Sequence, residues 1–222
     1  MRSQELQIPK EVSEVVQKLK EAGHEAYPVG GCVRDLLRGA KPKDWDVTTS
    51  AKPDEIQKIF PESFYENKFL TVTVKTGSED PALKEIEVTT FREEGKYTDK
   101  RHPDEVGFAK TLEEDLSRRD FTINTIALSL GNGVPKWEII DPFDGQEDLK
   151  KKLIRAVGDP EKRFEEDALR MMRAVRLAQE LDFEIEEKTR AAIKKLAGTL
   201  EFIARERVRD ELNKILLTPR AK

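Results

Sequence analysis

The sequence has 222 residues, of which 38% are charged and 37% are hydrophobic, and its formal net charge is −4 at pH 7. It contains no run of 18 apolar residues, which excludes a membrane-spanning helix, and its single cysteine, Cys32, excludes an internal disulfide. Residues 1–16 lack the apolar core of a secretory signal, so we expect a protein of the reducing cytoplasm.

Hydrophobic periodicity predicts alternating helices and strands through the first ninety residues. Apolar residues recur three and four apart where a helix is expected and two apart where a strand is expected. Gly23 ends the first helix, and Pro53 begins the third. The expected helices are 9–22, 33–37 and 53–60, and the expected strands are 26–29, 45–49, 69–75 and 85–91.

The chain changes character after Phe91. Residues from Arg92 to Pro103 are charged, include glycine and proline, and show no apolar period, so they predict a long loop of the kind that is often functional. From about Arg155 the pattern is helical, with no convincing strand. The sequence therefore predicts an α+β fold: a small antiparallel or mixed sheet with helices in residues 1–152, then an all-helical region in residues 153–222.

The two regions differ in charge. Residues 150–222 contain 19 Lys and Arg against 14 Asp and Glu, whereas residues 1–149 contain 21 against 30. An acidic front and a basic back suit a metal site followed by a region that contacts a polyanion. An uneven surface charge without a function explains the same counts, so both interpretations stay open on this observation alone.

Asp44 and Asp46 are two residues apart where a strand is expected to begin. Their carboxylates then point to one face of the strand, while Trp45 and Val47 point to the other. Paired carboxylates of this kind suit Mg²⁺, which usually takes one or two carboxylates together with substrate phosphates. For the aspartate pair by itself, a solvated strand entrance is the alternative.

Gly30 and Gly31 follow a strand and lead into a helix, an arrangement that predicts an anion site. Backbone N–H groups and the positive end of the helix dipole converge at such a turn, and Arg34 lies one turn further on. A tight strand-to-helix turn also explains the glycines. The combination of turn, arginine and paired aspartates within seventeen residues favours a nucleotide site.

These residues carry a family resemblance. GGCVRD at 30–35, followed by DWD at 44–46, resembles the catalytic head of the class II tRNA nucleotidyltransferases and bacterial poly(A) polymerases, within the polymerase-beta superfamily. Further motifs match in the same order: RRDFTINTIA at 118–127, EEDALRMMRAVRLA at 165–178 and RVRDELNKIL at 207–216. The resemblance spans nearly the whole chain and identifies residues 1–152 as the head and residues 153–222 as the neck.

The resemblance implies a two-metal nucleotidyl transfer. Asp44 and Asp46 are then both catalytic and metal-binding, and they hold two Mg²⁺ ions. One ion activates the RNA 3′-hydroxyl, and the other stabilises the triphosphate and the departing pyrophosphate. No covalent nucleophile is needed, because positioning and charge neutralisation lower the barrier. Glu87 alternates with Ile86 and Val88 on a neighbouring strand, and we leave it outside the metal site as a solvent-facing residue.

Residues 118–127 supply two further nucleotide contacts by the same resemblance. Arg119 corresponds to the arginine that contacts the triphosphate, and Asp120 to the carboxylate that accepts from the ribose 2′-hydroxyl. The alternative is an Arg–Asp ion pair in front of a helix whose apolar face is Phe121, Ile123 and Ile126.

Asp167, Arg170, Arg173 and Arg176 are three residues apart and predict a slanted stripe on one helix after Asp159-Pro160. A surface ladder of ion pairs has the same spacing. The alternative is base selection, because cytosine and adenine both present an exocyclic amine beside a ring-nitrogen acceptor. An aspartate and an arginine match both bases and mismatch guanine and uracil.

The family assigns that role to the motif that holds Asp167 and Arg170, and Arg173 and Arg176 extend the contacts. The implied partners are CTP, ATP and the tRNA 3′ end, with no membrane. The resemblance also likens the loop from Arg92 to Pro103 to a flexible loop used in passing from C to A addition.

The function predicted from the resemblance is template-independent CCA addition. An A-adding enzyme and a poly(A) polymerase are the alternatives within the enzyme class, and a non-catalytic nucleotide- or RNA-binding relative is the alternative outside it. Family members continue into helical body and tail regions that grip the tRNA. This chain stops near the expected end of the neck, and we expect it to be a truncated form.

Overall fold

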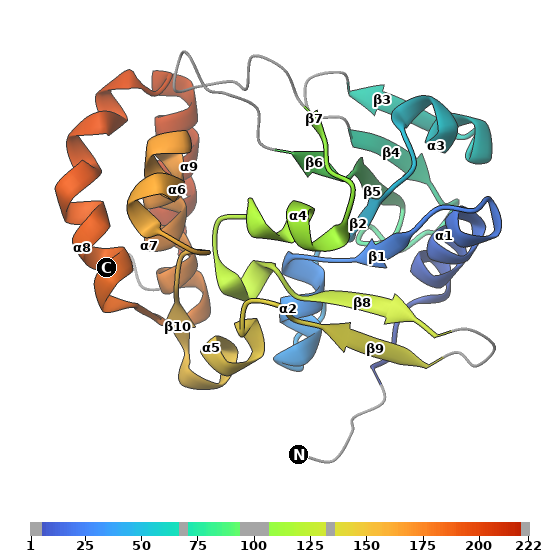
Figure 1. The fold of residues 1–222 in the computed structure, drawn as a ribbon, viewed down its shortest axis with the longest axis horizontal. Helices are drawn as coiled ribbons and strands as arrows, with labels where there is room; N and C mark the ends of the chain where they lie inside the picture. The colour runs from blue at the N-terminus through green and yellow to red at the C-terminus, as the bar shows by residue number, and fades with distance from the viewer. Residues whose placement is uncertain (1–5, 67–70, 94–106, 132–135, 219–222) are drawn as a thin grey trace. The chain divides into compact units, whose positions relative to one another are not determined.

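The computed structural model describes residues 6–66, 71–93, 107–131 and 136–218 (Figure 1). Packing divides the chain into two compact units that interleave along the sequence. Unit 1 comprises residues 1–92, 108–116 and 124–142, and unit 2 comprises residues 93–107, 117–123 and 143–222. The domain boundary expected near residue 152 stays a prediction.

Each helix and strand expected in the first ninety residues is present, and further elements up to residue 130 were not expected. The helices are α1 (Lys10–Glu21), α2 (Gly31–Leu37), α3 (Pro53–Ile59) and α4 (Leu112–Ser117), with a 3₁₀ turn at Thr122–Asn124. The strands are β1 (Ala26–Pro28), β2 (Asp46–Thr49), β3 (Ser63–Glu66), β4 (Thr71–Lys75), β5 (Glu85–Thr90), β6 (Arg92–Glu93), β7 (Gly107–Phe108) and β8 (Ala127–Leu130).

The remaining elements are mostly helical. The helices are α5 (Gly145–Lys151), α6 (Pro160–Glu166), α7 (Leu169–Leu181), α8 (Glu187–Leu196) and α9 (Arg205–Leu216), with a 3₁₀ segment at Ala197–Phe202. The strands are β9 (Trp137–Ile140), β10 (Leu153–Ile154) and β11 (Glu184–Ile185). The expectation of no strand after residue 155 was wrong at β11, which pairs in parallel with β10, because two residues are too few to show an alternating pattern.

Unit 1 is built on a five-stranded sheet in the order β1-β2-β5-β4-β3. β2 and β5 are parallel and the other neighbours are antiparallel, so the expected mixed sheet is confirmed. One face carries Val47, Val72 and Val88, each at most 1% exposed. α1 and α3 pack on the sheet strands, and the buried side of α1 is the valine and leucine stripe expected from the sequence.

The opposite face of this sheet is polar. The parallel ladder places Asp46 directly opposite Glu87, and Thr73 of β4 lies opposite Glu87 on the other side. Thr48 is two residues beyond Asp46 on the same face, and its hydroxyl donates to the carboxylate of Asp115, which is 1% exposed. The period of two thus separates an apolar face from a polar face.

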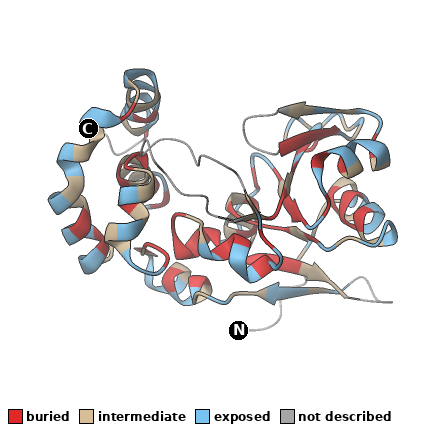
Figure 2. Cartoon of the chain, turned by 45° about the horizontal axis from the view of Figure 1, so that its top comes forward, coloured by how far each residue is buried: buried red, intermediate tan, exposed pale blue. Residues whose placement is uncertain are grey.

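Unit 2 has its own apolar core. Its largest fully buried side chains include Phe121, Ile154, Phe164 and Met171, and the strand-like segment at Phe121 forms a bridge to Ala156. Most of its helices show both buried and exposed residues, as amphipathic helices around one core do (Figure 2). α7 and α9 lie side by side in this unit (Figure 1).

Candidate nucleotidyl-transfer site

The turn before α2 requires glycine at Gly30 for a backbone reason. Gly30 has φ 86°, in the left-handed region that side-chain-bearing residues rarely occupy, and its N–H donates to the carbonyl of Ile126 at 3.3 Å. At Gly31, an added Cβ would lie 3.6 Å from a guanidinium nitrogen of Arg34, which is an ordinary contact. The two glycines and Arg34 therefore meet at one turn, as the sequence predicted.

Arg34 is held inside this turn by two partners. Its Nε and Nη2 donate to the two carboxylate oxygens of Asp35 at 2.9 and 3.0 Å, and its Nη1 donates to Asn124 Oδ1 at 2.9 Å. The side chain is 11% exposed, so its position is fixed. Asp35 neutralises much of the charge that a phosphate would meet. The assignment of Arg34 as a nucleotide contact stays a prediction.

Asp44 and Asp46 lie where the sequence placed them, at the entrance to β2. Asp44 is exposed and Asp46 is half-buried, while Trp45 and Val47 between and after them are 2% and 1% exposed. The exposed Glu87 lies opposite Asp46 in the parallel ladder, so these two carboxylates share one face of the sheet, and Asp44 lies two residues before Asp46. Mg²⁺ is usually bound by one or two carboxylates, and phosphate oxygens of the substrate complete its coordination shell. The carboxylates of Asp44 and Asp46 therefore suit this ion.

Cys32 packs behind Asp46 and is chemically inert. Its thiol is 1% exposed and lies 3.3 Å from the carbonyl oxygen of Val29. Burial, with the nearby charge of Asp46 as the second cause, raises the pKa of the Cys32 thiol to about 12. The prediction that Cys32 is a small packing residue is confirmed.

In unit 2, Asp120 and Arg173 form a close ion pair. Arg173 donates through Nε and Nη2 to Asp120 Oδ2 at 2.8 and 2.7 Å, and Asp120 Oδ1 accepts from the N–H of Phe121 at 2.8 Å. The negative charge of Asp120 is the largest cause that raises the pKa of Arg173. Two predicted nucleotide-binding residues are thus brought together, and Asp120 is 8% exposed.

The helix that the alternative interpretation placed in RRDFTINTIA does not form. The chain makes a 3₁₀ turn at Thr122–Asn124 and continues into β8, so the alternative of a helix with an apolar face is wrong. Thr122 donates to Asp148 Oδ2 at 2.5 Å, and its N–H donates to the carbonyl of Arg155 at 2.9 Å. These bonds hold the segment against the start of the helical region. Arg119 lies half-buried within the segment.

The predicted stripe of four residues is broken at Asp167. α6 ends at Glu166, and Asp167 has the extended angles φ −144° and ψ 102° before α7 begins. The carboxylate of Asp167 accepts from the N–H of Leu169 at 3.0 Å, a bond of the kind that starts a new helix. The single helix expected across Asp167 was therefore wrong, and only Arg170, Arg173 and Arg176 share α7.

Arg170 is tied to three acceptors. Its Nη1 donates to Glu166 Oε2 at 2.7 Å and to the carbonyl of Arg163 at 3.2 Å, and its Nη2 donates to the carbonyl of Arg118 at 3.0 Å. The side chain is 12% exposed. The guanidinium is therefore fixed by these acceptors, and the backbone N–H of Arg170 donates to the carbonyl of Asp167 at 3.0 Å.

α9 contacts two members of the predicted stripe. Arg207 donates through Nη2 to Asp167 Oδ2 at 3.0 Å. Arg176 donates through Nε to Glu211 Oε1 at 2.5 Å and also pairs with Glu180 of its own helix. The structure thus gives Arg176 two carboxylate partners and a place between helices. Its assignment as a nucleotide contact stays a prediction.

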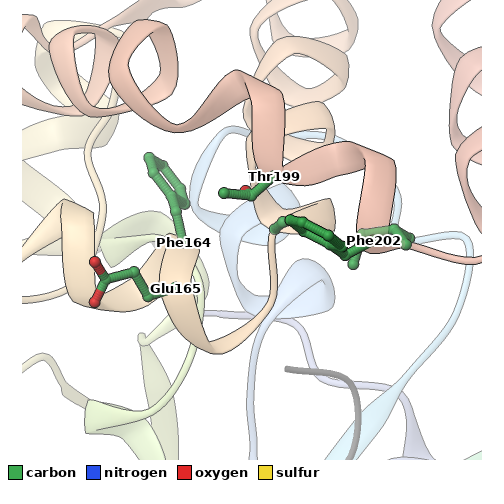
Figure 3. A pocket seen from close by; sticks show the side chains of 6 residues that line it. Phe164, Glu165, Thr199 and Phe202 are labelled. Carbon is green, nitrogen blue, oxygen red and sulfur yellow. The ribbon is translucent and has the colours of Figure 1, made fainter. Parts of the chain in front are cut away.

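A small pocket in unit 2 lies beside these helices and is not a nucleotide site. Phe164, Glu165, Thr199 and Phe202 line it, together with Ala168 and Ile203 (Figure 3). Its free space of about 20 Å³ holds roughly one water molecule. A nucleotide cannot enter a space of that size.

The remaining predictions concern the loop after Phe91, metal binding and membrane spans. Most of the predicted loop from Arg92 to Pro103 lies outside the described residues. Within the described ranges, no three or more His, Cys, Asp or Glu side chains group closely enough to hold a metal ion by themselves. No helix in the described part of the chain is long and apolar enough to cross a membrane.

Comparison with known proteins matches both regions of the chain. Residues 26–155 match the poly(A) polymerase head domain, and residues 182–222 match the domain described as the probable RNA- and SrmB-binding site of polymerase A. A CCA-adding enzyme of Lactobacillus helveticus is 50% identical over 209 residues, a match that covers 94% of this chain and 50% of the relative. The chain spans about half the length of the curated relatives it matches.

Solved structures agree with that similarity. The Bacillus stearothermophilus CCA-adding enzyme in complex with CTP has a TM-score of 0.83 and 42% identity, over 96% of this chain and 50% of the other. The Thermotoga maritima CCA-adding enzyme complexed with tRNA has a TM-score of 0.76 and 31% identity, over 96% of this chain and 48% of the other.

Proposed function

The chain belongs to the poly(A) polymerase head-domain family, and from that premise we propose that it transfers CMP and AMP from CTP and ATP to the 3′ end of tRNA, building or repairing CCA without a template. The observation that carries this proposal is the carboxylate face at the edge of β2, where Asp44 and Asp46 flank a buried tryptophan and Glu87 lies opposite Asp46. The similarity to CCA-adding enzymes selects CCA addition among transfer reactions.

Asp44 and Asp46 hold Mg²⁺ in this proposal. Bound Mg²⁺ would neutralise the triphosphate and lower the pKa of the attacking 3′-hydroxyl. The tRNA 3′-hydroxyl gives up its proton to solvent and its oxygen forms a bond to the α-phosphorus, while the P–O bond that joins the α- and β-phosphates breaks and pyrophosphate departs. Glu87 strengthens the negative field that attracts the cation. Gly30, Gly31 and Arg34 place backbone and guanidinium donors at the adjoining turn.

The residues that we propose select the nucleotide belong to unit 2. Asp167 accepts from the exocyclic amine of cytosine or adenine, and Arg170 donates to the ring nitrogen beside it. Arg170 can do this without reorganisation, because its three acceptors already fix its plane. Arg173 orients Asp120 toward a ribose 2′-hydroxyl. Arg119 contacts the triphosphate, and Arg176 extends the contacts with the nucleotide.

The test is extension of a tRNA that lacks its CCA end, with Mg²⁺ and either CTP, ATP or both nucleotides. Ordered gain of C, C and then A supports the proposal. Gain of A alone points instead to an A-adding enzyme, and a long A tail points to a poly(A) polymerase. Failure to bind CTP or ATP at all contradicts the proposal.

We also propose that the chain works in the cytoplasm. Its single cysteine is a buried thiol, a state that a reducing compartment preserves.

A further inference from the structure

Asp148 is a buried carboxylate that has no part in the proposed reaction. It belongs to α5, which lies beside β10 (Figure 1), and it is 4% exposed. Its Oδ2 accepts from the hydroxyl of Thr122 at 2.5 Å and from Nε of Arg155 at 2.8 Å. A buried charge is costly unless donors satisfy it, and these two donors do so. The bond from Thr122 also links Asp148 to the segment that carries two proposed nucleotide contacts.

The backbone of this segment pairs with residues 155–157 of the same unit. The N–H of Thr122 donates to the carbonyl of Arg155 at 2.9 Å, and the carbonyl of Asp120 accepts from the N–H of Val157 at 3.2 Å. So short a ladder is weak by itself. The side-chain bond from Thr122 to Asp148 therefore adds a third anchor at the end of the ladder, two residues from Asp120.

The carboxylate of Asp120 depends on how its own backbone is held. Its Oδ1 accepts from the N–H of the next residue, Phe121, at 2.8 Å, and its Oδ2 accepts from Nε of Arg173 at 2.8 Å. The first donor belongs to the same segment, whereas the second belongs to α7. Because one methylene group joins the carboxylate to the backbone, a shift of the segment moves the carboxylate with it.

Arg119 precedes Asp120 in the segment but should be less sensitive to such a shift. Its side chain is long and has many rotamers, so the guanidinium can return to the same place after a small movement of the backbone. A loosened segment should therefore weaken a contact with the ribose more than a contact with the triphosphate.

We propose that Asp148 is a positioning residue: by accepting from Thr122 it fixes the backbone that carries Asp120, and it thereby sets the preference for ribonucleotides over 2′-deoxyribonucleotides. The inference rests on the function proposed above, because it assigns the ribose 2′-hydroxyl to Asp120. Asp148 acts only through this segment, and Arg155 neutralises its charge.

Equilibrium binding of CTP and 2′-deoxy-CTP in the presence of Mg²⁺ tests the proposal on the 222-residue chain. Thr122→Val keeps the shape of the side chain and removes the hydroxyl, while Arg155 still satisfies the charge of Asp148. Thr122→Ser keeps the hydroxyl. Glu147→Gln is the matched control, because Glu147 is an exposed neighbour on α5 whose side chain pairs with Lys150 at the surface.

We expect Thr122→Val to lower the ratio of CTP affinity to 2′-deoxy-CTP affinity about fivefold, within the net contribution of one hydrogen bond. Its affinity for 2′-deoxy-CTP should match the wild type, because that ligand lacks the hydroxyl that Asp120 accepts from. Thr122→Ser and Glu147→Gln should keep the wild-type ratio.

An unchanged ratio in Thr122→Val overturns the proposal. An equal loss of both affinities also overturns it, because that is the result of a merely structural role. If Thr122→Val melts at the assay temperature, Asp148→Asn decides by the same comparison, since a neutral amide is a weaker acceptor for the same hydroxyl.

A double-mutant cycle tests whether the effect passes through Asp120. In the Asp120→Ala background, Thr122→Val should leave the ratio unchanged, because no carboxylate remains to be positioned. A further fall would mean that Thr122 acts by another route and would overturn the inference. A wild-type chain that binds both ligands equally contradicts the ribose contact assigned to Asp120, and one that binds neither contradicts the proposed function. Both results differ from an unchanged ratio in the variant.

Discussion

Asp46 is the residue on which transfer depends most directly. Asp46→Ala should reduce CMP transfer by about a thousandfold or more, because the cation loses one of its two carboxylates. The fold should survive, since Asp46 is half-buried at the start of a strand. Initial rates of tRNA extension and a thermal melt measure the two effects. Asp54→Ala, an exposed aspartate on α3, is the control; equal losses in both variants would contradict the assignment.

Cys32 gives a pH-dependent prediction. Its pKa rises from an ordinary value of 9.0 to about 12 in the fold, so above pH 9 the unfolded chain loses this proton while the folded chain keeps it. The Cys32 contribution to the free energy of unfolding should therefore be constant below pH 9 and fall by about 1.4 kcal/mol per pH unit from there to about pH 12.

Urea unfolding at pH 8, 9 and 10, compared with Cys32→Ala, isolates this effect. The difference between the two proteins should shrink as the pH rises. At pH 8 the folded thiol should also resist alkylation that the urea-unfolded chain undergoes readily. Rapid alkylation of the folded protein would show that Cys32 is neither buried nor protonated as described.

The sequence predicted which candidate site residues lie close together only where that proximity depends on short spacing along the chain. The Asp44–Asp46 pair, the glycine turn and Arg34 fall within seventeen residues, so their proximity follows from strand and turn geometry. The partners of these residues were not predictable. Asn124 reaches Arg34 from ninety positions away, and Glu87 reaches Asp46 only through a parallel pairing that no local pattern encodes.

At the scale of elements, α9 should be stabilised by Glu211. Glu211→Ala should lower the free energy of unfolding by about 2 kcal/mol, less than the cost of breaking an isolated buried pair, because Arg176 keeps Glu180. Glu206→Ala, on the exposed part of the same helix, should change it by less than about 0.5 kcal/mol. Thermal or urea unfolding distinguishes the two; equal effects would mean that the Glu211 pair does not stabilise the fold.

Elements with a long apolar period were predictable, and short ones were not. α1, β4 and β5 lie within a residue or two of their predicted bounds, because apolar residues recur three and four apart along α1 and two apart along β4 and β5. β3, β8, β10 and α4 were missed, since two to six residues give too little pattern. The break at Asp167 escaped detection because the three-residue spacing continues through it.

At the scale of the whole molecule, the interleaved units predict how the chain can be divided. The core of unit 2 includes Phe121 and Ile123, which precede its main segment. A fragment of residues 143–222 should therefore lack a cooperative thermal transition, whereas residues 117–222 should show one. Circular dichroism melts of both fragments measure this. A cooperative transition in the shorter fragment would contradict the role of the 117–123 segment.

The interleaving also has a consequence for synthesis. Val29, beside β1, is bridged by Ala127, the first residue of β8, about one hundred residues later in the chain. At about 5–20 residues per second, the ribosome exposes the edge of β1 for roughly 5–20 s before β8 emerges. An unpaired strand edge is a template for association with other chains. The nascent protein is therefore most vulnerable to aggregation during that interval and would gain most from a chaperone then.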